Sequence, residues 1–301
     1  MSKQYKLSVI IPVFDTNVNY LEECFLSIDK QTYQNFEVIL VNDCSKKFAT
    51  AQFINQYPKT HEKYRVINLP QGFGPGNARN VGVENSTGEI IVFIDSDDYL
   101  LPKCFEVINT TFNQWPDLDF LSFEIKILMS NGELYDPTAN RVFSSTPTNV
   151  SENPNFANTR CSVWAKGFSK KFLIDNNIWF KKEDMYMEDL YYHMLLLSKS
   201  QKTIYINDVL YILRETVNSR ALSEFNAKKA NDIFHCYTEA YKEIKNDNNF
   251  LSKNFAEYFK NSFFSKIDYM SKFCNFKQTD DYKKLVNEAN KFLFSLTNTK
   301  A

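Results

Sequence analysis

The chain has 301 residues, of which 44% are hydrophobic and 24% are charged, and its formal net charge is −1. This composition is typical of a folded globular protein, and a net charge so close to zero provides no overall field that would attract nucleic acid. The six cysteines lack a CxxC or another metal-type spacing, so we expect reduced thiols in a cytoplasmic protein. No apolar run approaches the ~20 residues that a membrane-spanning helix needs. We therefore expect a soluble protein, at most peripheral at the inner face of the cytoplasmic membrane.

Up to residue 128, apolar β-branched runs alternate with segments whose apolar residues recur at helical spacing. The predicted strands are residues 6–14, 36–43, 64–69, 89–95 and 118–128. The predicted helices are residues 19–31, 48–56, 76–86 and 102–114. This alternation predicts an α/β fold with a mostly parallel central sheet and helices on both faces.

The alternation stops after residue 130. Residues 129–160 are rich in Asn, Ser, Thr and Pro and predict loops and short strands, while 185–199 predicts a helix and 203–215 a strand. From about residue 224 the spacing of apolar residues predicts helices. We expect a first domain at 1–222, divided into halves at 1–115 and 116–222, and a C-terminal helical region at 223–301.

The predicted fourth strand ends in three carboxylates within four positions, Asp95, Asp97 and Asp98. Asp15 and Asp43 also follow predicted strands, and in parallel sheets ligands bind outside the carboxyl ends of the strands. Carboxylates this close raise each other's pKa unless a cation compensates their charge. Mg²⁺ binds one or two protein carboxylates together with substrate phosphates. The pattern predicts a metal–diphosphate site, and the alternative is a solvated turn or a helix N-cap at Asp98.

Other features near the predicted strand ends fit a nucleotide. Asp43 can accept the N3–H of uracil, and Phe14 can offer its ring to a base, although Asp43 can also cap a helix and Phe14 can belong to the core. The segment "GFGPGNARN" permits close approach of its backbone to a ligand, with Arg79 in the first turn of the next helix. It lacks GxGxxG spacing and does not follow the first strand, so a dinucleotide site is not predicted.

Five segments occur in the order and at the spacing of a known family. They are "SVIIPVFD", "SIDKQTYQNFEVILVNDCS", "GPGNARNVGV", "TGEIIVFIDSDDYL" and "MEDLYYHMLLL". Together they resemble the family 2 glycosyltransferases over roughly residues 5–115 and again over 160–220, but not beyond about 225. The resemblance implies a GT-A nucleotide-diphospho-sugar transferase fold, in which 1–115 binds the nucleotide and 116–222 the acceptor. It also implies inverting transfer of a sugar from a nucleotide donor to an acceptor hydroxyl.

The resemblance implies a role for each matching residue of the nucleotide half. Phe14 would stack on the base, Asp43 would bind uracil and Arg79 would lie beside the nucleotide. Asp95 would contact the ribose or the metal, and Asp97 would be the main ligand of Mn²⁺ or Mg²⁺, with Asp98 supporting the site. The other donor-binding positions that it implies are Pro12, Asp15, Ser96, Trp164, Lys166 and Arg214.

The segment "MED" (187–189) resembles the acidic pair that the family carries ahead of a helix. By that resemblance Asp189 is the general base and Glu188 orients the acceptor or the sugar. The reaction needs such a group, because the acceptor hydroxyl must lose its proton as it attacks the anomeric carbon opposite the departing diphosphate. The alternative is that both acids only complement the positive end of the helix dipole. His193, one helical turn after Asp189 on the same face, is expected to be a surface or core histidine, and a role in binding the metal is the alternative.

The stretch "SVWAKGFSKKFL" (162–173) resembles one found in bacterial members that build surface oligosaccharides. Trp164 can stack on the donor or acceptor sugar, and Lys166 can reach the phosphates. The alternative for Trp164 is a place in the core.

The sequence departs from the family at two positions. Thr216 stands where many relatives carry a histidine that helps to hold the metal or the diphosphate. We expect the metal to have fewer protein ligands, or Arg214 and Arg220 to supply charge to the diphosphate. Asn42 replaces a frequent Asp, and we expect a smaller effect there because the next residue is an aspartate.

Residues 251–301 carry nine lysines and five acidic side chains, a net charge of +4. Their apolar side chains recur near i, i+3/i+4 spacing at Phe255, Tyr258, Phe259, Phe263, Ile267 and Met270. One interpretation is a helical bundle packed on the first domain or on a second subunit, as in a homodimer. The other is a basic, aromatic surface that contacts an anionic membrane, where glycolipid acceptors lie.

The expected function is metal-dependent transfer of a hexose or N-acetylhexosamine from a UDP-sugar, the activity of a hexosyltransferase. By resemblance alone, the acceptor is a saccharide or glycolipid of a bacterial surface glycan such as lipooligosaccharide or capsule. One alternative is a non-catalytic homologue that binds a nucleotide sugar or a glycan. The other is a sugar-1-phosphate nucleotidyltransferase, although such enzymes carry a glycine-rich loop after the first strand and "IPVFDTNVNY" has no glycine.

Overall fold

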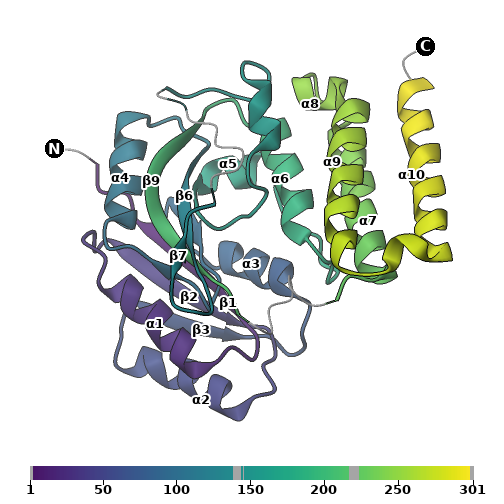
Figure 1. The fold of residues 1–301 in the computed structure, drawn as a ribbon. Helices are drawn as coiled ribbons and strands as arrows, with labels where there is room; N and C mark the ends of the chain where they lie inside the picture. The colour runs from purple at the N-terminus through teal and green to yellow at the C-terminus, as the bar shows by residue number, and fades with distance from the viewer. Residues whose placement is uncertain (1–2, 138–143, 145, 217–223, 299–301) are drawn as a thin grey trace.

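The computed structural model describes residues 3–137, 144, 146–216 and 224–298, and a mixed β-sheet forms its centre (Figure 1). The strands are β1 (Leu7–Val13), β2 (Phe36–Asn42), β3 (Tyr64–Asn68), β4 (Ile90–Phe93), β5 (Tyr99–Leu100), β6 (Phe120–Leu128), β7 (Leu134–Tyr135), β8 (Lys166–Ser169) and β9 (Thr203–Arg214). Within the described residues their order in the sheet is β3-β2-β1-β4-β8-β6-β9-β5, with β7 beside β6.

Helices cover both faces of the sheet (Figure 1). They are α1 (Val18–Asp29), α2 (Phe48–Gln56), α3 (Pro75–Glu84), α4 (Cys104–Gln114), α5 (Lys170–Asp175), α6 (Glu188–Lys199), α7 (Ala227–Ile244), α8 (Phe250–Lys253), α9 (Phe255–Met270) and α10 (Asp280–Asn298). Short 3₁₀ turns lie at Tyr57–Lys59, Pro154–Asn158, Ser271–Phe273 and Phe276–Gln278. Helices α1, α2 and α4 share one hydrophobic cluster with the sheet, and α3, α5 and α6 share another. Helices α7, α9 and α10 form a further layer outside α6.

Strand β1 shows why both faces of the sheet are buried. Side chains of a strand alternate between faces, so Leu7 and Val9 pack with α1 and α4 while Ile10 packs with α3. Helix α3 lies so close to β1 that a Cβ on Gly82 would stand 2.2 Å from Cγ2 of Ile10. A glycine is therefore needed at this contact. The close packing brings α3, with Arg79 on it, next to the parallel strands.

The expected α/β fold with helices on both faces is confirmed, and strands β1 to β4 pair in parallel as predicted. The second half of the sheet is mixed, because β8 lies between β4 and β6 and runs antiparallel to both. Parallel pairing returns between β6 and β9, so the predicted mostly parallel sheet is interrupted at β8 and at the short strands β5 and β7, which pair antiparallel. Strand β8 has four residues and β5 has two. Strands so short leave no recognisable period in the sequence.

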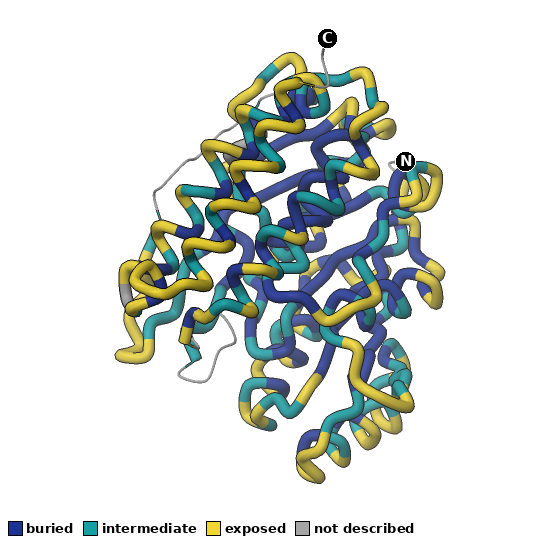
Figure 2. Tube along the Cα trace, turned by 90° about the vertical axis from the view of Figure 1, so that its right-hand side faces the viewer, coloured by how far each residue is buried: buried dark blue, intermediate teal, exposed yellow. Residues whose placement is uncertain are grey.

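The C-terminal helices turn their apolar sides inward, and exposed residues recur along the outer helices in Figure 2. In α9, the side chains of Phe255, Phe259, Phe263 and Ile267 are at most 1% exposed. They belong to the same hydrophobic cluster as Ile10 of β1. The helices thus pack on the first domain, which is the first of the two interpretations, and most of the predicted aromatic stripe is unavailable to a membrane.

The hydrophobic cluster around α6 crosses the predicted domain boundary at 222/223. It runs from Ile39 of β2 through Leu196 of α6 to Ala240 of α7 and Leu296 of α10. The division into two domains therefore stays a prediction from the sequence. Among the described residues, no helix combines the length and the apolarity that crossing a membrane requires.

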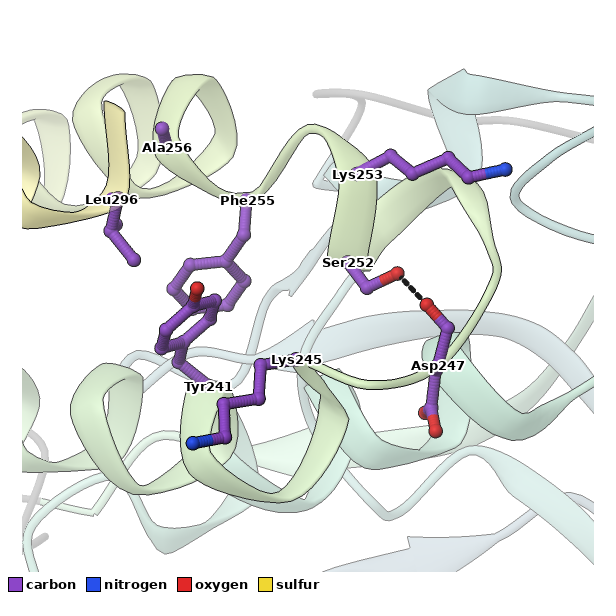
Figure 3. Close-up of a pocket in the computed structure, with 8 residues that line it drawn as sticks. All are labelled: Tyr241, Lys245, Asp247, Ser252, Lys253, Phe255, Ala256 and Leu296. Carbon is purple, nitrogen blue, oxygen red and sulfur yellow. Dashed lines mark hydrogen bonds between the residues drawn. The ribbon is translucent and has the colours of Figure 1, made fainter. Parts of the chain in front are cut away.

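A pocket of about 230 Å³ opens among the C-terminal helices (Figure 3). It is lined by Tyr241, Lys245, Asp247, Ser252, Lys253, Phe255, Ala256 and Leu296. The hydroxyl of Ser252 donates a hydrogen bond to the carbonyl of Asp247 at its edge. None of the predicted site residues lines this pocket, so it is separate from the carboxylates at the strand ends.

Candidate active site

The carboxyl ends of β1, β2 and β4 lie side by side because these strands are parallel neighbours. The main-chain N–H of Asp43, just after β2, donates to the carbonyl of Val13 at 2.9 Å. The hydroxyls of Ser96, after β4, and of Thr16, after β1, are 2.6 Å apart. Three segments that are distant in the sequence therefore meet at one edge of the sheet, where a ligand is predicted.

Arg79 joins this edge to the predicted acidic pair. Its guanidinium lies 2.7 Å from Asp95, 2.9 Å from Glu188 and 3.2 Å from Asp189. The Arg79 side chain is 3% exposed, whereas the side chains of the three acids are 14–30% exposed. One buried cation thus gathers a carboxylate from the segment after β4 and two from α6, and water still reaches the acids. Glu188 and Asp189 do lie in the first turn of α6, but they do more than face its dipole.

Asp189 is held at both oxygens. Oδ1 accepts from Arg79, and Oδ2 accepts from the main-chain N–H of Val163 at 3.1 Å. Burial raises the pKa of Asp189 to about 7, although Arg79 lowers it, and Glu188 raises it further. A carboxyl group whose pKa is raised by burial, in a fixed position, suits a general base.

The Asp98 side chain points into the interior of the protein. It is 1% exposed, and it accepts hydrogen bonds from the Tyr211 hydroxyl at 2.5 Å and from the main-chain N–H of Arg214 at 2.7 Å. Burial raises its pKa well above the usual range, with a further contribution from Asp97. Helix α4 begins later, with Lys103 at its N-cap. The alternatives of a solvated turn or an N-cap at Asp98 are therefore wrong.

Asp97 is half-buried and has the features of a metal ligand. No other described residue donates a hydrogen bond to its carboxylate. Burial and the neighbouring Asp95 raise its pKa to about 6, while its own main-chain N–H and Arg214 lower the pKa and offset the charge only in part. Within the described part of the chain no three His, Cys, Asp or Glu side chains form a closed metal cage. A site with one or two carboxylates and substrate phosphates, as Mg²⁺ uses, fits these residues.

Asp43 shapes the glycine-rich loop that leads into α3. Its oxygens accept from the main-chain N–H groups of Phe73 at 2.9 Å and Gly74 at 2.8 Å, and Gly74 adopts a φ of 87° that favours glycine. Burial raises the pKa of Asp43. Helix α2 has Lys47 at its N-cap, so the alternative that Asp43 caps it is wrong. Phe14 is 56% exposed, so it does not belong to the core.

The stretch at 160–166 lies partly inside the protein. Trp164 is half-buried and stacks on Tyr211, with ring centroids 5.1 Å apart and planes at 16°. Lys166 is 2% exposed, its ammonium donates to the carbonyls of Arg160 and Ser162, and burial lowers its pKa to about 8. Contact of Lys166 with phosphates, and of Trp164 with a sugar, therefore stay predictions.

The remaining predicted residues have mainly structural contacts. Pro12 is buried in β1 opposite Val41, and the Asp15 carboxylate accepts from the main-chain N–H groups of Lys46 and Lys47. Asn42 donates a hydrogen bond to the side chain of Asn68, and the small effect expected at that departure from the family stays a prediction.

Arg214 reaches the acidic turn from the end of β9. Its Nε donates to the carbonyl of Asp97 at 3.0 Å, and its guanidinium pairs with Glu23 and lies 4.6 Å from the Tyr20 ring centroid. Arg220, the other cation expected near the diphosphate, lies outside the described residues. A diphosphate contact of Arg214 stays a prediction.

His193 is a core histidine, as one of the expectations had it. It is 1% exposed, and neither ring nitrogen has a hydrogen-bond partner in the described structure. Burial lowers its pKa well below the usual value, and Lys166 and Lys266 lower it further.

The sequence did not reveal several residues that hold the site together. Tyr211 binds the acidic turn, the N–H of Val163 binds Asp189, and Asn80 binds both main-chain groups of Phe180 at 2.9 and 3.0 Å. Asn80 lies inside the glycine-rich segment GFGPGNARN, and that position is the only feature of the sequence that could have indicated its role. Left-handed backbone at non-glycine residues is another sign, because such strain clusters at functional sites. Among the described residues it occurs at Asp15, Cys44, Ala165, Asn177 and Met187, and all except Asn177 adjoin a predicted site residue.

The model of a family described as "Glycosyl transferase family 2" matches residues 8–163. The chain belongs to glycosyl transferase family 2. Among curated relatives, the uncharacterized glycosyltransferase EpsJ of Bacillus subtilis is 28% identical over 231 residues, which are 75% of this chain and 65% of EpsJ. Glycosyltransferase GlyG of Streptococcus pneumoniae is 27% identical over 77% of this chain and 78% of GlyG.

A solved structure of Staphylococcus aureus TarS in complex with UDP-GlcNAc matches with a TM-score of 0.70. The match has 24% identity and covers 84% of this chain and 70% of that chain, and it shows a common fold. TarS is named a poly(ribitol-phosphate) beta-N-acetylglucosaminyltransferase. The expected membership of family 2, the GT-A fold and the glycosyltransferase class of enzyme are confirmed.

Proposed function

We propose that the chain is an inverting glycosyltransferase that moves a hexose or N-acetylhexosamine from a UDP-sugar with the help of Mn²⁺ or Mg²⁺. The observation that carries the proposal is the position of Arg79, which holds Asp95 at the strand ends together with Glu188 and Asp189. A donor site and a proton acceptor are thereby kept next to each other. Fixed proximity of this kind lowers the barrier of a displacement reaction.

The donor would bind at the ends of β1 and β2. The exposed ring of Phe14 can stack on a base. Asp43 uses one hydrogen bond at each oxygen for Phe73 and Gly74, and because a carboxylate has about four lone-pair sites it can still accept the N3–H of uracil. The UDP-GlcNAc bound to TarS supports a UDP-sugar as the donor.

Asp97 would hold the metal, and Asp95 would contribute a lone pair that its contact with Arg79 does not use. When bound, the metal would offset the charge that develops on the departing diphosphate. The hydrogen bond from Arg214 to the Asp97 carbonyl would keep the turn in place. Ser96 lies between Asp95 and Asp97 in the sequence, and a hydrogen bond between its hydroxyl and that of Thr16 holds it in place.

Asp189 would take the proton of the acceptor hydroxyl while the hydroxyl oxygen forms a bond to the anomeric carbon. The bond from that carbon to the diphosphate oxygen breaks at the same time, and its electron pair leaves with UDP. Attack from the face opposite the leaving group inverts the anomeric configuration. Glu188 would orient the acceptor or the sugar, and Trp164 would offer its exposed part to either.

We propose a saccharide or glycolipid of a bacterial surface glycan, such as lipooligosaccharide or capsule, as the acceptor, used on the cytoplasmic side. The name of TarS supports a cell-surface polymer as the general class. Contact with a membrane would rely on Tyr269 and Phe294, which are 60% and 70% exposed, and on nearby lysines. Flotation with anionic liposomes tests it: the double variant Tyr269→Ser, Phe294→Ser should lose binding that the wild type shows.

The experiment that tests the proposed function is a UDP-release assay across a panel of UDP-sugars and simple saccharide acceptors in Mn²⁺, with EDTA as the control. We expect release with at least one donor–acceptor pair and its loss in EDTA. UDP binding without release from any pair would favour the non-catalytic homologue. Release of pyrophosphate would identify a nucleotidyltransferase instead.

A further inference from the structure

Tyr211 of β9 connects the parts of the candidate site, although no sequence motif pointed to it. Its side chain is fully buried. Its hydroxyl donates to Asp98 at 2.5 Å and accepts from the main-chain N–H of Asp95 at 3.2 Å. One phenol oxygen therefore binds both ends of the turn that carries Asp97.

The ring of Tyr211 extends this connection toward the proposed base. Trp164 stacks on it with nearly parallel planes. The residue before Trp164 is Val163, whose N–H donates to Asp189. Ala165, which follows, has a φ of 57°, so the segment is held in a conformation that side-chain-bearing residues rarely adopt. The metal-side turn and the base-side segment thus share one buried aromatic support.

We propose that Tyr211 is a positioning residue whose hydroxyl fixes the acidic turn for binding of metal and diphosphate, and whose ring holds Trp164 against it. This inference rests on the proposed function, because it assigns Tyr211 to the donor site of the same enzyme. Tyr211 itself is buried behind the turn and touches neither the donor nor the acceptor.

The hydroxyl is needed because the turn places three carboxylates together. Asp98 accepts hydrogen bonds from the Tyr211 hydroxyl and from the N–H of Arg214, and the N–H of Asp95 donates to the Tyr211 oxygen. Removal of the hydroxyl leaves both Asp98 and the N–H of Asp95 short of a partner, and the turn can then relax. Loss of a group that supports metal ligands costs about ten- to a hundredfold in metal affinity.

Tyr211→Phe removes this oxygen and keeps the ring that stacks on Trp164. Tyr237→Phe is a matched control, because Tyr237 is equally buried and its hydroxyl lies 2.5 Å from that of Ser262, in the C-terminal helices. Tyr211→Phe loses two hydrogen bonds of a buried hydroxyl and Tyr237→Phe loses one, so we expect a small decrease in melting temperature for both variants, somewhat larger for Tyr211→Phe. Binding of UDP is measured by calorimetry at a series of Mn²⁺ concentrations, and again in EDTA.

We expect Tyr211→Phe to raise the half-saturating Mn²⁺ concentration about ten- to a hundredfold, with little change in the affinity for UDP in EDTA. Tyr237→Phe should match the wild type in both. If the wild type binds UDP with Mn²⁺ and Tyr211→Phe binds it equally well, the role of Tyr211 is wrong and the proposed function stands. An equal loss with and without metal, or misfolding beyond that of Tyr237→Phe, would make Tyr211 merely structural. A wild type that does not bind UDP would overturn both proposals.

Discussion

Replacement of the proposed base, Asp189→Asn, separates chemistry from binding. The amide can keep one of the two contacts of Asp189, to Arg79 or to the N–H of Val163, but it cannot take a proton. Arg79 keeps Asp95 and Glu188, so the site retains its shape apart from one lost hydrogen bond to a charged group, worth about 1.5 to 3 kcal/mol. General base catalysis contributes about 10²- to 10⁴-fold to the rate, or about 3 to 5 kcal/mol.

The assay is sugar transfer with the donor–acceptor pair found in the UDP-release panel, together with calorimetry of UDP. We expect kcat to fall by about 10²- to 10⁴-fold while the affinity for UDP stays within a few-fold of the wild type. Asp119→Asn is a matched control, because Asp119 accepts from two main-chain N–H groups, those of Gln201 and Lys202, but lies outside the site. It should keep the wild-type kcat. Wild-type turnover by Asp189→Asn would refute the assignment of the base.

Three further changes test the charges of the site. Asp97→Ala should weaken Mn²⁺-dependent binding of UDP at least about tenfold and leave binding in EDTA unchanged, and equal binding in Mn²⁺ would exclude Asp97 as the ligand. Arg79→Met leaves three carboxylates without their buried cation, so urea denaturation should show that the free energy of unfolding falls by about 3 to 5 kcal/mol. The control is Arg65→Met, at the half-exposed pair with Glu37, which should lower it by at most about 1 kcal/mol. A loss under about 1 kcal/mol for Arg79→Met would contradict the buried cluster. Burial lowers the pKa of His193 in the folded protein, so as the pH falls the unfolded chain takes up a proton there before the folded chain does. The free energy of unfolding therefore falls below about pH 6.5, by up to about 1.4 kcal/mol per pH unit. Denaturation at pH 7.5 and 5.5 should show a smaller difference for His193→Leu than for the wild type, and an unchanged difference would place the pH dependence elsewhere.

The strand ends were predictable because two simple rules apply to them. Apolar runs identified β1, β2 and β4, and parallel strands bring their carboxyl ends to one edge. This was enough to expect Asp43 near Asp97 without any coordinates. The direction of each side chain was not predictable. Asp97 is half-buried and Asp98 points inward to Tyr211, although the two are neighbours in one acidic run.

Contacts between distant segments explain most of what the sequence did not show. The three acids around Arg79 come from two elements, and Glu188 lies 109 residues away from it in the chain. A main-chain donor such as the N–H of Val163 has no residue type that would reveal it. Lys166 was expected to be able to reach the phosphates, and nothing in the sequence indicated that its ammonium donates to main-chain carbonyls inside the protein.

The central claim is that carboxylates at one edge of the sheet hold a cation and, through that cation, the diphosphate of an activated sugar. Calorimetric titration of the wild-type protein with UDP, in Mn²⁺ and in EDTA, tests it most directly. We predict saturable heat in Mn²⁺ and at least about a tenfold weaker affinity in EDTA. Absence of binding heat in Mn²⁺, or equal affinity in both buffers, would contradict the claim.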